Sequence, residues 1–503
     1  MTYTRPYPAG FLDYPDVTTP LSAGVLNTMD VGIKTANDQI QTLTTIERNA
    51  LAATATLGQL VWDSTLNELF VWINATGANA WQGIGNYIIC TSTTRPATPV
   101  VGMRIYETDT KFNYTYIGTT WTPSGDTVIC TFATRPATAS VGQVAYQTDT
   151  DEVIKYVTDL DAQNRWMVLD HDYRRNMVIN GGFDVWQRGT SFNPVSATST
   201  TGLNYGADRW QFLQATTNAS GFTRQAITAT DPAGYNYFLR VQRVAASGTT
   251  TAFTVQTSFE SQNIQNVRGK YVTLSFWARA GANYSAASSY LVSDIVTGTG
   301  SDNTVGNFTT NTVNTTANNV LTTSWKRFTV TTSAVLATSI TQLGVRFVFT
   351  PVGASAGAAD QFDITGVMLE TGTAPSDFEF RDFGEELRRC QRYYWRMGPY
   401  VSGSQRFGSG VITSTSSANV FTQLPVTMRS VPTALEQSGT AANYLVANLG
   451  TGTACTSVPT FSSATVDSVL TTFTTGATLV AGQACQAGNN STTTAYLGWS
   501  AEL

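Results

Sequence analysis

The sequence has few charged side chains and almost no histidine. Of its 503 residues 13% are charged, with 29 Lys and Arg against 34 Asp and Glu, and the formal net charge is −5. A nucleic-acid-binding protein needs a basic face to neutralise phosphates, so DNA and RNA are not expected partners. The single histidine, His171, excludes a multi-histidine metal site. Any Ser-His-Asp triad would have to use this residue.

Long apolar runs and cofactor motifs are also missing. No run of 18 apolar residues exists, so we expect no helix inserted in a membrane. The first residues lack the apolar core of a secretory signal, which predicts synthesis in a cytosol. Neither a Walker A nor a dinucleotide-binding motif is present, so no cofactor is expected. The five cysteines, at positions 90, 130, 390, 455 and 485, are widely spaced without a C-x-x-C pair, which predicts reduced and mostly buried thiols.

The residues that are abundant favour β structure. Thr, Val and aromatic residues favour strands, and 41 Gly with 16 Pro provide turns, so we expect a mainly β chain. Aromatic residues make up 11% of the sequence, which excludes wholesale disorder.

A short amphipathic helix is predicted near the start. Thr19 and Pro20 suit its first positions. Apolar residues then recur at alternating steps of three and four, at Leu26, Met29, Ile33, Ala36, Ile40 and Leu43. Such a narrow stripe indicates a coiled-coil-like seam between copies of the chain, although packing on its own chain would also account for it.

Residues 46–170 contain three repeats. Residues 90–98 recur at 130–138 with an offset of 40, and the two copies close on Trp121 and Trp166. A more divergent copy runs from Gly58 to Trp81. Each repeat predicts a β-hairpin covered by an aromatic residue, and such small units must stack on neighbours to form a shaft. Arg95 and Arg135, each followed by proline, are expected to have a structural role.

Residues 171–380 predict a β-sandwich of the jelly-roll type with about eight strands. Apolar residues alternate with polar ones along three segments, at Phe253, Val255, Thr257 and Phe259; at Val272, Leu274 and Phe276; and at Leu343, Val345, Phe347 and Phe349. Residues 362–369 are nearly all apolar, which indicates a strand buried on both faces.

A connecting helix is predicted over 381–397. Asp382 and Glu385 suit a capping box, and an apolar stripe follows at Leu387, Cys390, Tyr394 and Met397. Leu387, Cys390 and Tyr394 are therefore further candidates for a seam between copies. Glu385 and Arg389 are spaced as an i,i+4 ion pair. The four arginines of this segment (388, 389, 392 and 396) favour a solvated face, or one salt-bridged to another copy of the chain, over a nucleic-acid site.

Residues 398–503 predict a β tip domain with almost no charge. Between Glu436 and Ser500 the only charged side chain is Asp467. A neutral, hydroxyl-rich surface with exposed aromatic rings suits carbohydrate, because rings stack on sugar CH groups. The candidate receptor-binding residues are Tyr400, Phe407, Phe421, Tyr444, Tyr496 and Trp499. The alternative is that these rings form the core of the domain, and the sandwich is the rival binding region.

Catalysis is not expected. The nearest approach to a catalytic pair would be two carboxylates of the sandwich, Asp360 with Asp363 or with Glu370, in the manner of a glycosidase.

Several stretches together resemble tail fibres of tailed bacteriophages. The repeats TSTTRPATPVVGMRIYETDT and TFATRPATASVGQVAYQTDT are similar to tail-fibre repeats. The segments 180–189 and 207–210 resemble the start of the carbohydrate-binding-like jelly roll of such proteins, and 269–279 resembles its central strand. Residues 386–394 resemble the helix before the tip, 424–433 a tip strand, and 19–30 the fibre N-terminus.

The resemblance implies an elongated homotrimeric fibre of the virion tail. Residues 1–45 would attach to a tail or baseplate protein, and the C-terminal tip would adsorb to a bacterial surface glycan or outer-surface protein. Two alternatives remain open: a polysaccharide depolymerase tailspike, although the long parallel β-helix pattern of those enzymes is absent, and a purely structural baseplate or tail component.

Overall fold

The computed structural model describes residues 40–65, 68–75, 78–84, 88–99, 103–110, 112–123, 127–159, 163–169, 176–193, 199–353, 355–398 and 405–503. Strands account for 45% of it and helices for 8%, so the mainly β prediction is confirmed. The chain divides into two compact units, residues 1–148 with 155–157 and residues 149–154 with 158–503. No helix in the described ranges combines the length and the apolar character that crossing a membrane requires.

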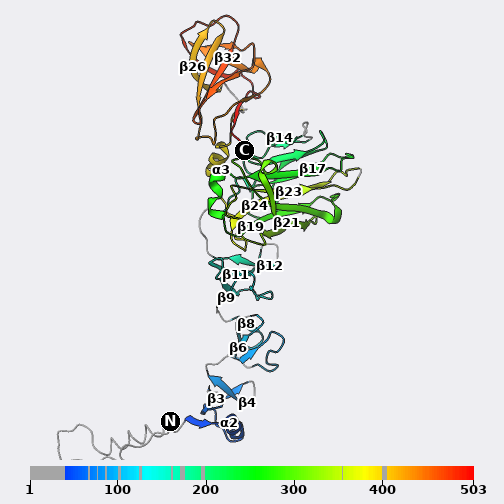
Figure 1. Cartoon of the computed structure of the whole chain (residues 1–503), viewed down its shortest axis with the longest axis vertical. Coiled ribbons are helices and arrows are strands. Elements are labelled where there is room, and N and C mark those ends of the chain that lie inside the picture. The colour runs from blue at the N-terminus through cyan, green and yellow to red at the C-terminus, as the bar shows by residue number, and fades with distance from the viewer. Residues whose placement is uncertain are drawn as a thin grey trace, which may run out of the picture. The chain divides into compact units, whose positions relative to one another are not determined.

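Three four-stranded sheets occupy residues 40–168, and in each the first strand pairs in parallel with the second (Figure 1). The first sheet contains β1 (Ile40–Leu43), β2 (Leu60–Asp63), β3 (Glu68–Ala75) and β4 (Ala78–Ile84). The second contains β5 (Ile88–Cys90), β6 (Arg104–Glu107), β7 (Phe112–Tyr116) and β8 (Trp121–Pro123). The third contains β9 (Val128–Cys130), β10 (Val144–Gln147), β11 (Glu152–Thr158) and β12 (Asn164–Val168).

Aromatic pairs and ion pairs stabilise these small sheets. Trp81 lies opposite Trp72 with ring centroids 5.1 Å apart, and Trp121 lies opposite Tyr116 at 5.3 Å. Arg95 pairs with Glu107, whose side chain is fully buried. The Arg95 guanidinium therefore has a partner within its own repeat, in agreement with the structural role predicted for Arg95.

The predicted N-terminal seam is wrong at its C-terminal end. Ile40 and Leu43 lie in β1, a strand that pairs with β2, and Ile40 is 43% exposed. After β1 the described chain turns into α2 (Thr45–Leu51), where Thr44 and Glu47 form a capping box. Residues 40–43 form a strand because they pair with Leu60–Asp63. The spacing of apolar residues is a local feature of the sequence, so it could not predict pairing with a segment 20 residues away. Leu26, Met29, Ile33, Ala36 and His171 lie outside the described residues.

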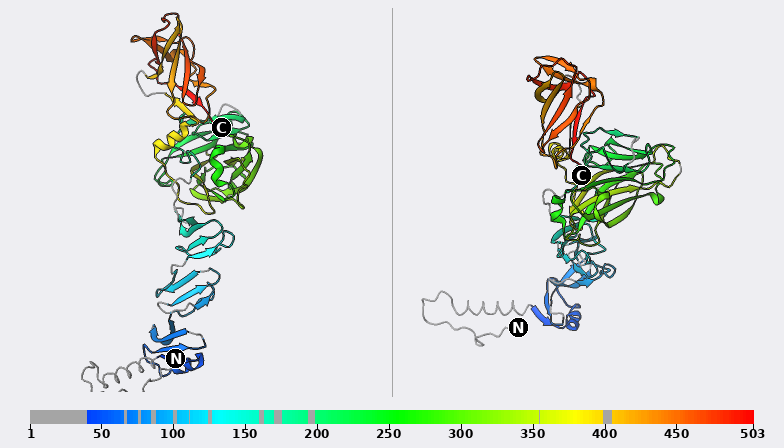
Figure 2. Two further views of the ribbon diagram at one scale, coloured as in Figure 1. Left: turned by 60° about the vertical axis from the view of Figure 1, so that its left-hand side comes forward. Right: turned by 45° about the horizontal axis from the view of Figure 1, so that its top comes forward.

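Two six-stranded antiparallel sheets form a sandwich in the second unit (Figure 2). One has the order β13 (Ser191–Phe192), β16 (Ser220–Ala226), β17 (Tyr237–Arg243), β24 (Gln361–Thr371), β19 (Val272–Ala280) and β22 (Lys326–Thr331). The other has the order β14 (Ser199–Tyr205), β15 (Gln211–Gln214), β18 (Phe253–Ser258), β23 (Gln342–Phe349), β20 (Tyr290–Thr299) and β21 (Thr309–Val320). Short 3₁₀ helices lie in the connections between strands: η1 (Ser261–Val267) and η2 (Ala287–Ser289) between the two sheets, and η3 (Val305–Asn307) between β20 and β21.

The core of the sandwich is the one that the alternation predicts. Phe253, Phe276 and Phe347 are fully buried in a single apolar cluster. Residues 361–370 of β24 are buried on both faces, because this strand lies inside its sheet between β17 and β19. The predicted number of about eight strands is too low: twelve are present, since short edge strands such as β13 carry too few residues to show a period of two.

The C-terminal region begins with α3 (Phe383–Gln391), which is capped by Asp382 through a hydrogen bond from the Gly384 amide (2.8 Å). A three-stranded sheet follows, with the order β25 (Tyr394–Met397), β34 (Leu497–Ser500) and β28 (Leu435–Gln437). A seven-stranded sheet has the order β30 (Thr451–Ala454), β29 (Tyr444–Asn448), β33 (Ala484–Asn489), β26 (Arg406–Ser414), β27 (Ser417–Gln423), β32 (Ser468–Thr474) and β31 (Thr460–Ala464). The 3₁₀ helix η4 (Ala441–Asn443) precedes β29.

Buried charges join the C-terminal segment to the sandwich. Glu502 accepts hydrogen bonds from Arg209 and Arg188, and each of the three side chains is no more than 11% exposed. The Arg188 guanidinium also lies 3.4 Å from the ring centroid of Tyr394, and Arg209 lies 3.6 Å from that of Tyr393. These contacts bind residues 393–394 and 502 to the start of the sandwich, so this part of the chain is integral to the second unit.

Candidate functional site

Three of the predicted receptor-binding aromatics are core residues. Phe407, Tyr444 and Trp499 are at most 1% exposed and belong to one apolar cluster of the C-terminal region. The Tyr444 hydroxyl donates to the backbone carbonyl of Tyr496 (2.7 Å), and Trp499 stacks on Trp395 at 5.3 Å. The prediction is wrong for these three, because strand alternation directs their side chains inward.

The remaining candidates do not form a cluster. Phe421 is 49% exposed on β27, and Tyr496 is half-buried beneath the Arg396 guanidinium, 3.4 Å from its ring centroid. Tyr400 lies outside the described residues. On the outer face of the seven-stranded sheet, Phe421 has only Ser409 and Leu470 as direct cross-strand neighbours. This face therefore offers one isolated ring.

The seam candidates near α3 are mostly buried within their own chain. Cys390 and Tyr394 are fully buried and Leu387 is half-buried, so Cys390 and Tyr394 cannot face another copy. Tyr394 is also a strand residue, because the helix ends at Gln391 and residues 394–397 pair with β34.

The arginines that follow α3's first turn are used within the chain. Arg389 pairs with Glu385 at 2.8 Å, and Arg392 pairs with Glu260 at 2.8 Å. Arg396 donates to the backbone carbonyl of Arg188 (2.6 Å). The predicted i,i+4 pair of Glu385 and Arg389 is confirmed, whereas the partner of Arg392 lies in the same chain and not in another copy.

The three carboxylates considered for catalysis hold the sandwich together. Asp360 pairs with the buried Arg243 (3.2 Å), and Asp363 pairs with Arg240 and Arg279 (both 2.8 Å). Glu370 accepts a hydrogen bond from the Ser376 amide (2.8 Å). Each is at most 1% exposed, so none offers a carboxylate to a bound sugar.

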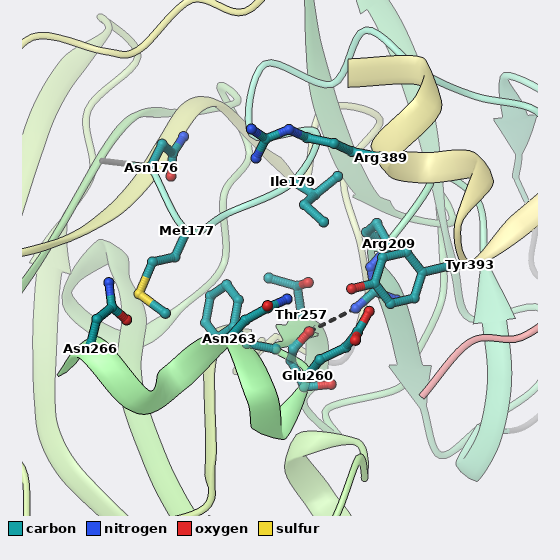
Figure 3. Close-up of a pocket in the computed structure, with 12 residues that line it drawn as sticks. Asn176, Met177, Ile179, Arg209, Thr257, Glu260, Asn263, Asn266, Arg389 and Tyr393 are labelled. Carbon is teal, nitrogen blue, oxygen red and sulfur yellow. Dashed lines mark hydrogen bonds between the residues drawn. The ribbon is translucent and has the colours of Figure 1, made fainter. Parts of the chain in front are cut away.

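One cavity of about 240 Å³ lies between the sandwich and the segment around α3 (Figure 3). We call it the junction cavity; its lining includes Met177, Thr257, Asn263, Asn266, Arg389 and Tyr393. Its two aromatic side chains, Phe259 and Tyr393, are 7% and 2% exposed, so neither presents a ring face.

The charged groups of the junction cavity already have partners. Glu260 is held by Arg392, whose Nε and Nη2 donate at 2.8 and 2.9 Å. Burial alone would raise the pKa of Glu260, but hydrogen bonds with Arg392, Tyr393 and Gln262 and the charge of Arg392 together outweigh burial and lower it. Arg209 donates to Glu502 and to the Ser258 carbonyl (2.8 Å). The junction cavity is therefore best explained as a packing gap beside an ion-pair network.

A second cavity of about 130 Å³ has the features that the tip lacks. We call it the aromatic cavity, because four aromatic residues line it: Tyr235, Phe378, Phe380 and Phe383. The rings of Tyr235, Phe378 and Phe380 lie 4.9–5.2 Å apart in all three pairings. Phe380 is 59% exposed and Phe383 58%, so both present ring surface to solvent.

A polar pair lies in the same cavity. Asn236 Nδ2 donates to Asp184 Oδ1 at 3.1 Å. Burial raises the pKa of Asp184; the hydrogen bond from Asn236 opposes this, and the charge of Glu386 adds to it. A carboxylate beside an amide accepts and donates hydrogen bonds at neighbouring positions, as adjacent sugar hydroxyls require. Ring faces next to such a pair are typical of carbohydrate sites.

Local sequence places these groups together. Gly234 has φ +91°, a conformation that favours glycine, and a Cβ there would lie 3.1 Å from the Phe380 ring. Asp184 follows Gly181 and Gly182, where a Cβ on Gly181 would meet the Val367 carbonyl at 2.0 Å. Sequence reasoning missed this site, although the run Phe378, Phe380 and Phe383 just before the charged part of α3 was a visible signal.

Comparisons with known proteins give a fold likeness only. No protein-family model matches the chain, and no curated protein matches it. A similar solved structure is the enzymatically active domain of tailspike protein 4 of bacteriophage CBA120, with 14% identity and a TM-score of 0.24 over 39% of this chain. The match spans only 21% of that tailspike chain.

Two other similar structures are much shorter chains. One is an apo cyclase from Fischerella sp., with 13% identity and a TM-score of 0.25, covering 40% of this chain and 97% of that one. The other is TmCBM61, described in complex with β-1,4-galactotriose, with 11% identity and a TM-score of 0.23, covering 40% and 100%. At these TM-scores no functional conclusion follows.

Proposed function

We propose that this chain is a bacteriophage tail fibre that adsorbs to a glycan on the bacterial surface through the aromatic cavity of its sandwich. The observation that carries the proposal is the side-by-side placement of the Phe380 ring and the Asp184–Asn236 pair. The resemblance of several sequence segments to tail fibres, in the same order along the chain, supports the setting. The sandwich thus replaces the tip as the primary binding region, because the tip's described candidates are buried or isolated.

The chemistry of this site is binding without cleavage. A sugar ring would stack on the exposed face of Phe380, and its hydroxyls would exchange water for Asp184 and Asn236. The buried carboxylates Asp360, Asp363 and Glu370 are committed to partners within the fold. Of the carboxylates that line the cavity, Glu379 and Glu386 are held by Arg381 at 3.4 and 3.2 Å. Glycoside hydrolysis needs two carboxyl groups beside the bond to be cleaved, so a site in which these two carboxylates are ion-paired favours an adhesin over a depolymerase.

Association as a parallel homotrimer, mounted on a tail or baseplate protein, completes the proposal. Ile89 and Ile129 are 72% and 75% exposed, and they occupy the same place in two repeats 40 residues apart. A parallel copy of this chain presents apolar residues at the same spacing, so both would be covered together. Light scattering of the full-length protein should give about three times the 54.1 kDa monomer mass; a stable monomer at micromolar concentration would exclude the trimer.

The glycan assignment is tested on an array of bacterial polysaccharides and on intact cells. Phe380→Ser should weaken binding at least tenfold, or about 1.4 kcal/mol. Phe421→Ser, at the exposed ring of the C-terminal sheet, is the matched control and should bind as the parent does. Periodate treatment of the cells should abolish binding and protease treatment should not. Loss of binding with Phe421→Ser alone would move the receptor site to the tip.

A further inference from the structure

The aromatic cavity has an excess of negative charge. Its ionisable lining residues are Asp184, Glu379, Glu386 and Arg381, so three carboxylates face one guanidinium. An acidic sugar would meet repulsion here, whereas a cationic group would be attracted.

Arg381 does not neutralise Asp184. Its guanidinium is only 5% exposed and is held by Glu386 at 3.2 Å and by Glu379 at 3.4 Å. It also donates to the backbone carbonyl of Val178 at 3.0 Å. Arg381 is therefore fixed between the two glutamates.

Asp184 is the carboxylate without a cation. In the part of the chain that the structure describes, its hydrogen-bond donor is the neutral amide of Asn236, and no lysine or arginine lies within ion-pair distance. Arg224, whose charge also acts on Asp184, lies over the Tyr237 ring at 4.2 Å. A half-buried carboxylate that has a neutral amide as its hydrogen-bond donor and no cation within ion-pair distance favours a positively charged ligand.

The aromatic rings favour the same kind of ligand. The face of an aromatic ring attracts an ammonium group within about 6 Å of its centroid, and several rings around one site strengthen the effect. Tyr235, Phe378 and Phe380 stand at mutual distances of 4.9–5.2 Å, and Phe380 is more than half exposed. At about 130 Å³ the cavity is below the 300–1,000 Å³ of drug-sized sites, so it fits a substituent and leaves the sugar ring outside.

We propose that the aromatic cavity recognises an amino sugar with a free ammonium group, with Asp184 as its counter-ion. This rests on the proposed glycan-binding function and specifies its ligand. The ammonium group enters between Asp184 and the aromatic rings, while the pyranose ring lies on Phe380. N-acetylation would remove the charge and enlarge the substituent, so it would weaken binding.

The preference for a free ammonium group is tested by comparing how two trisaccharides bind to the full-length protein. They are the β-1,4 trisaccharides of glucosamine and of N-acetylglucosamine, which differ only in acetylation. Binding is measured by calorimetry at about pH 5.5, where the sugar amines carry their positive charge and a carboxyl with the ordinary Asp pKa of about 3.9 is ionised. The glucosamine trisaccharide should bind at least tenfold more tightly. Asp184→Asn should reduce this preference at least fivefold.

Asp377→Asn is the matched control, because Asp377 is exposed and does not line the cavity. It should leave both affinities within twofold, and all variants should keep the parent's mass in light scattering. Equal or tighter binding of the acetylated trisaccharide, or a preference that survives in Asp184→Asn, would overturn the inference. If Phe380-dependent binding to neutral glycans persists in that case, the proposed function stands and only the ligand class is wrong. Absence of binding to both trisaccharides and to every polysaccharide on the array would refute both.

Discussion

Arg209 and Glu502 form an ion pair in which both side chains are 2% exposed, and it joins the start of the sandwich to the C-terminal segment. Arg188 shares the same carboxylate at 3.4 Å. Removing the residues after Met397 would leave two buried guanidinium groups without their counter-ion. Point variants are therefore better probes of the C-terminal region than truncation is.

Glu502→Gln should destabilise the second unit by about 3–5 kcal/mol, because it leaves buried charges unpaired. Denaturant unfolding of the full-length protein measures the change. Glu385→Gln is the matched control: it breaks the exposed i,i+4 pair with Arg389, where the carboxylate is 42% exposed, and should cost less than about 1 kcal/mol. Similar losses for the two variants would contradict a structural role for the buried pair.

Asp208 should make stability depend on pH. Burial raises the pKa of this fully buried carboxyl to about 6, against the opposing effects of Arg188 and the hydrogen bonds from Gln187. Because the folded-state pKa lies above the unfolded value, the stabilising contribution is complete below about pH 4 and is lost as the pH rises through about 6. Relative to Asp208→Asn, the parent's free energy of unfolding should fall between pH 4 and pH 6.5. Parallel pH profiles for the two proteins would count against this.

Gly206→Ala should disrupt the sandwich core. A Cβ at Gly206 would lie 1.8 Å from Cε2 of Phe222, a core ring that also packs on Phe212 at 4.9 Å. Moving this ring typically costs about 1–3 kcal/mol. Gly306→Ala is the control, because no atom lies within 4 Å of the added methyl group. Thermal unfolding should show a lower midpoint for Gly206→Ala only.

Tyr444→Ala and Phe421→Ala should differ sharply in stability. Tyr444 is fully buried and its hydroxyl bonds the Tyr496 carbonyl, so truncation should cost about 3–5 kcal/mol. Phe421 is half exposed, and its truncation should cost less than about 1 kcal/mol. Equal costs, measured by denaturant unfolding, would mean that Phe421 is covered in the assembled protein.

The sequence by itself determined the mainly β class and much of the sandwich core. Period-two alternation at 253–259, 272–276 and 343–349 identifies inward residues, because successive strand side chains point to opposite faces. The i,i+4 pair of Glu385 and Arg389 is likewise local and was predictable. The burial of β24 could be predicted from its nearly continuous apolar composition. A strand that is covered on both faces has no face directed to solvent, so apolar residues need not alternate with polar ones along it.

Only the tertiary structure decided which aromatic residues are exposed and which charges meet. Phe407, Tyr444 and Trp499 have the same local signature as Phe421, and their burial depends on which strands cover them. Asp184 and Asn236 are 52 residues apart, and Phe380 comes from a third segment, so these residues meet only when segments distant in the sequence come together in the folded domain. The same limit explains Ile40 and Leu43: apolar spacing favoured a helix, but hydrogen bonding to Leu60–Asp63 made the segment a strand. Spacing records local preference, whereas contacts between distant segments depend on the free energy of the whole fold.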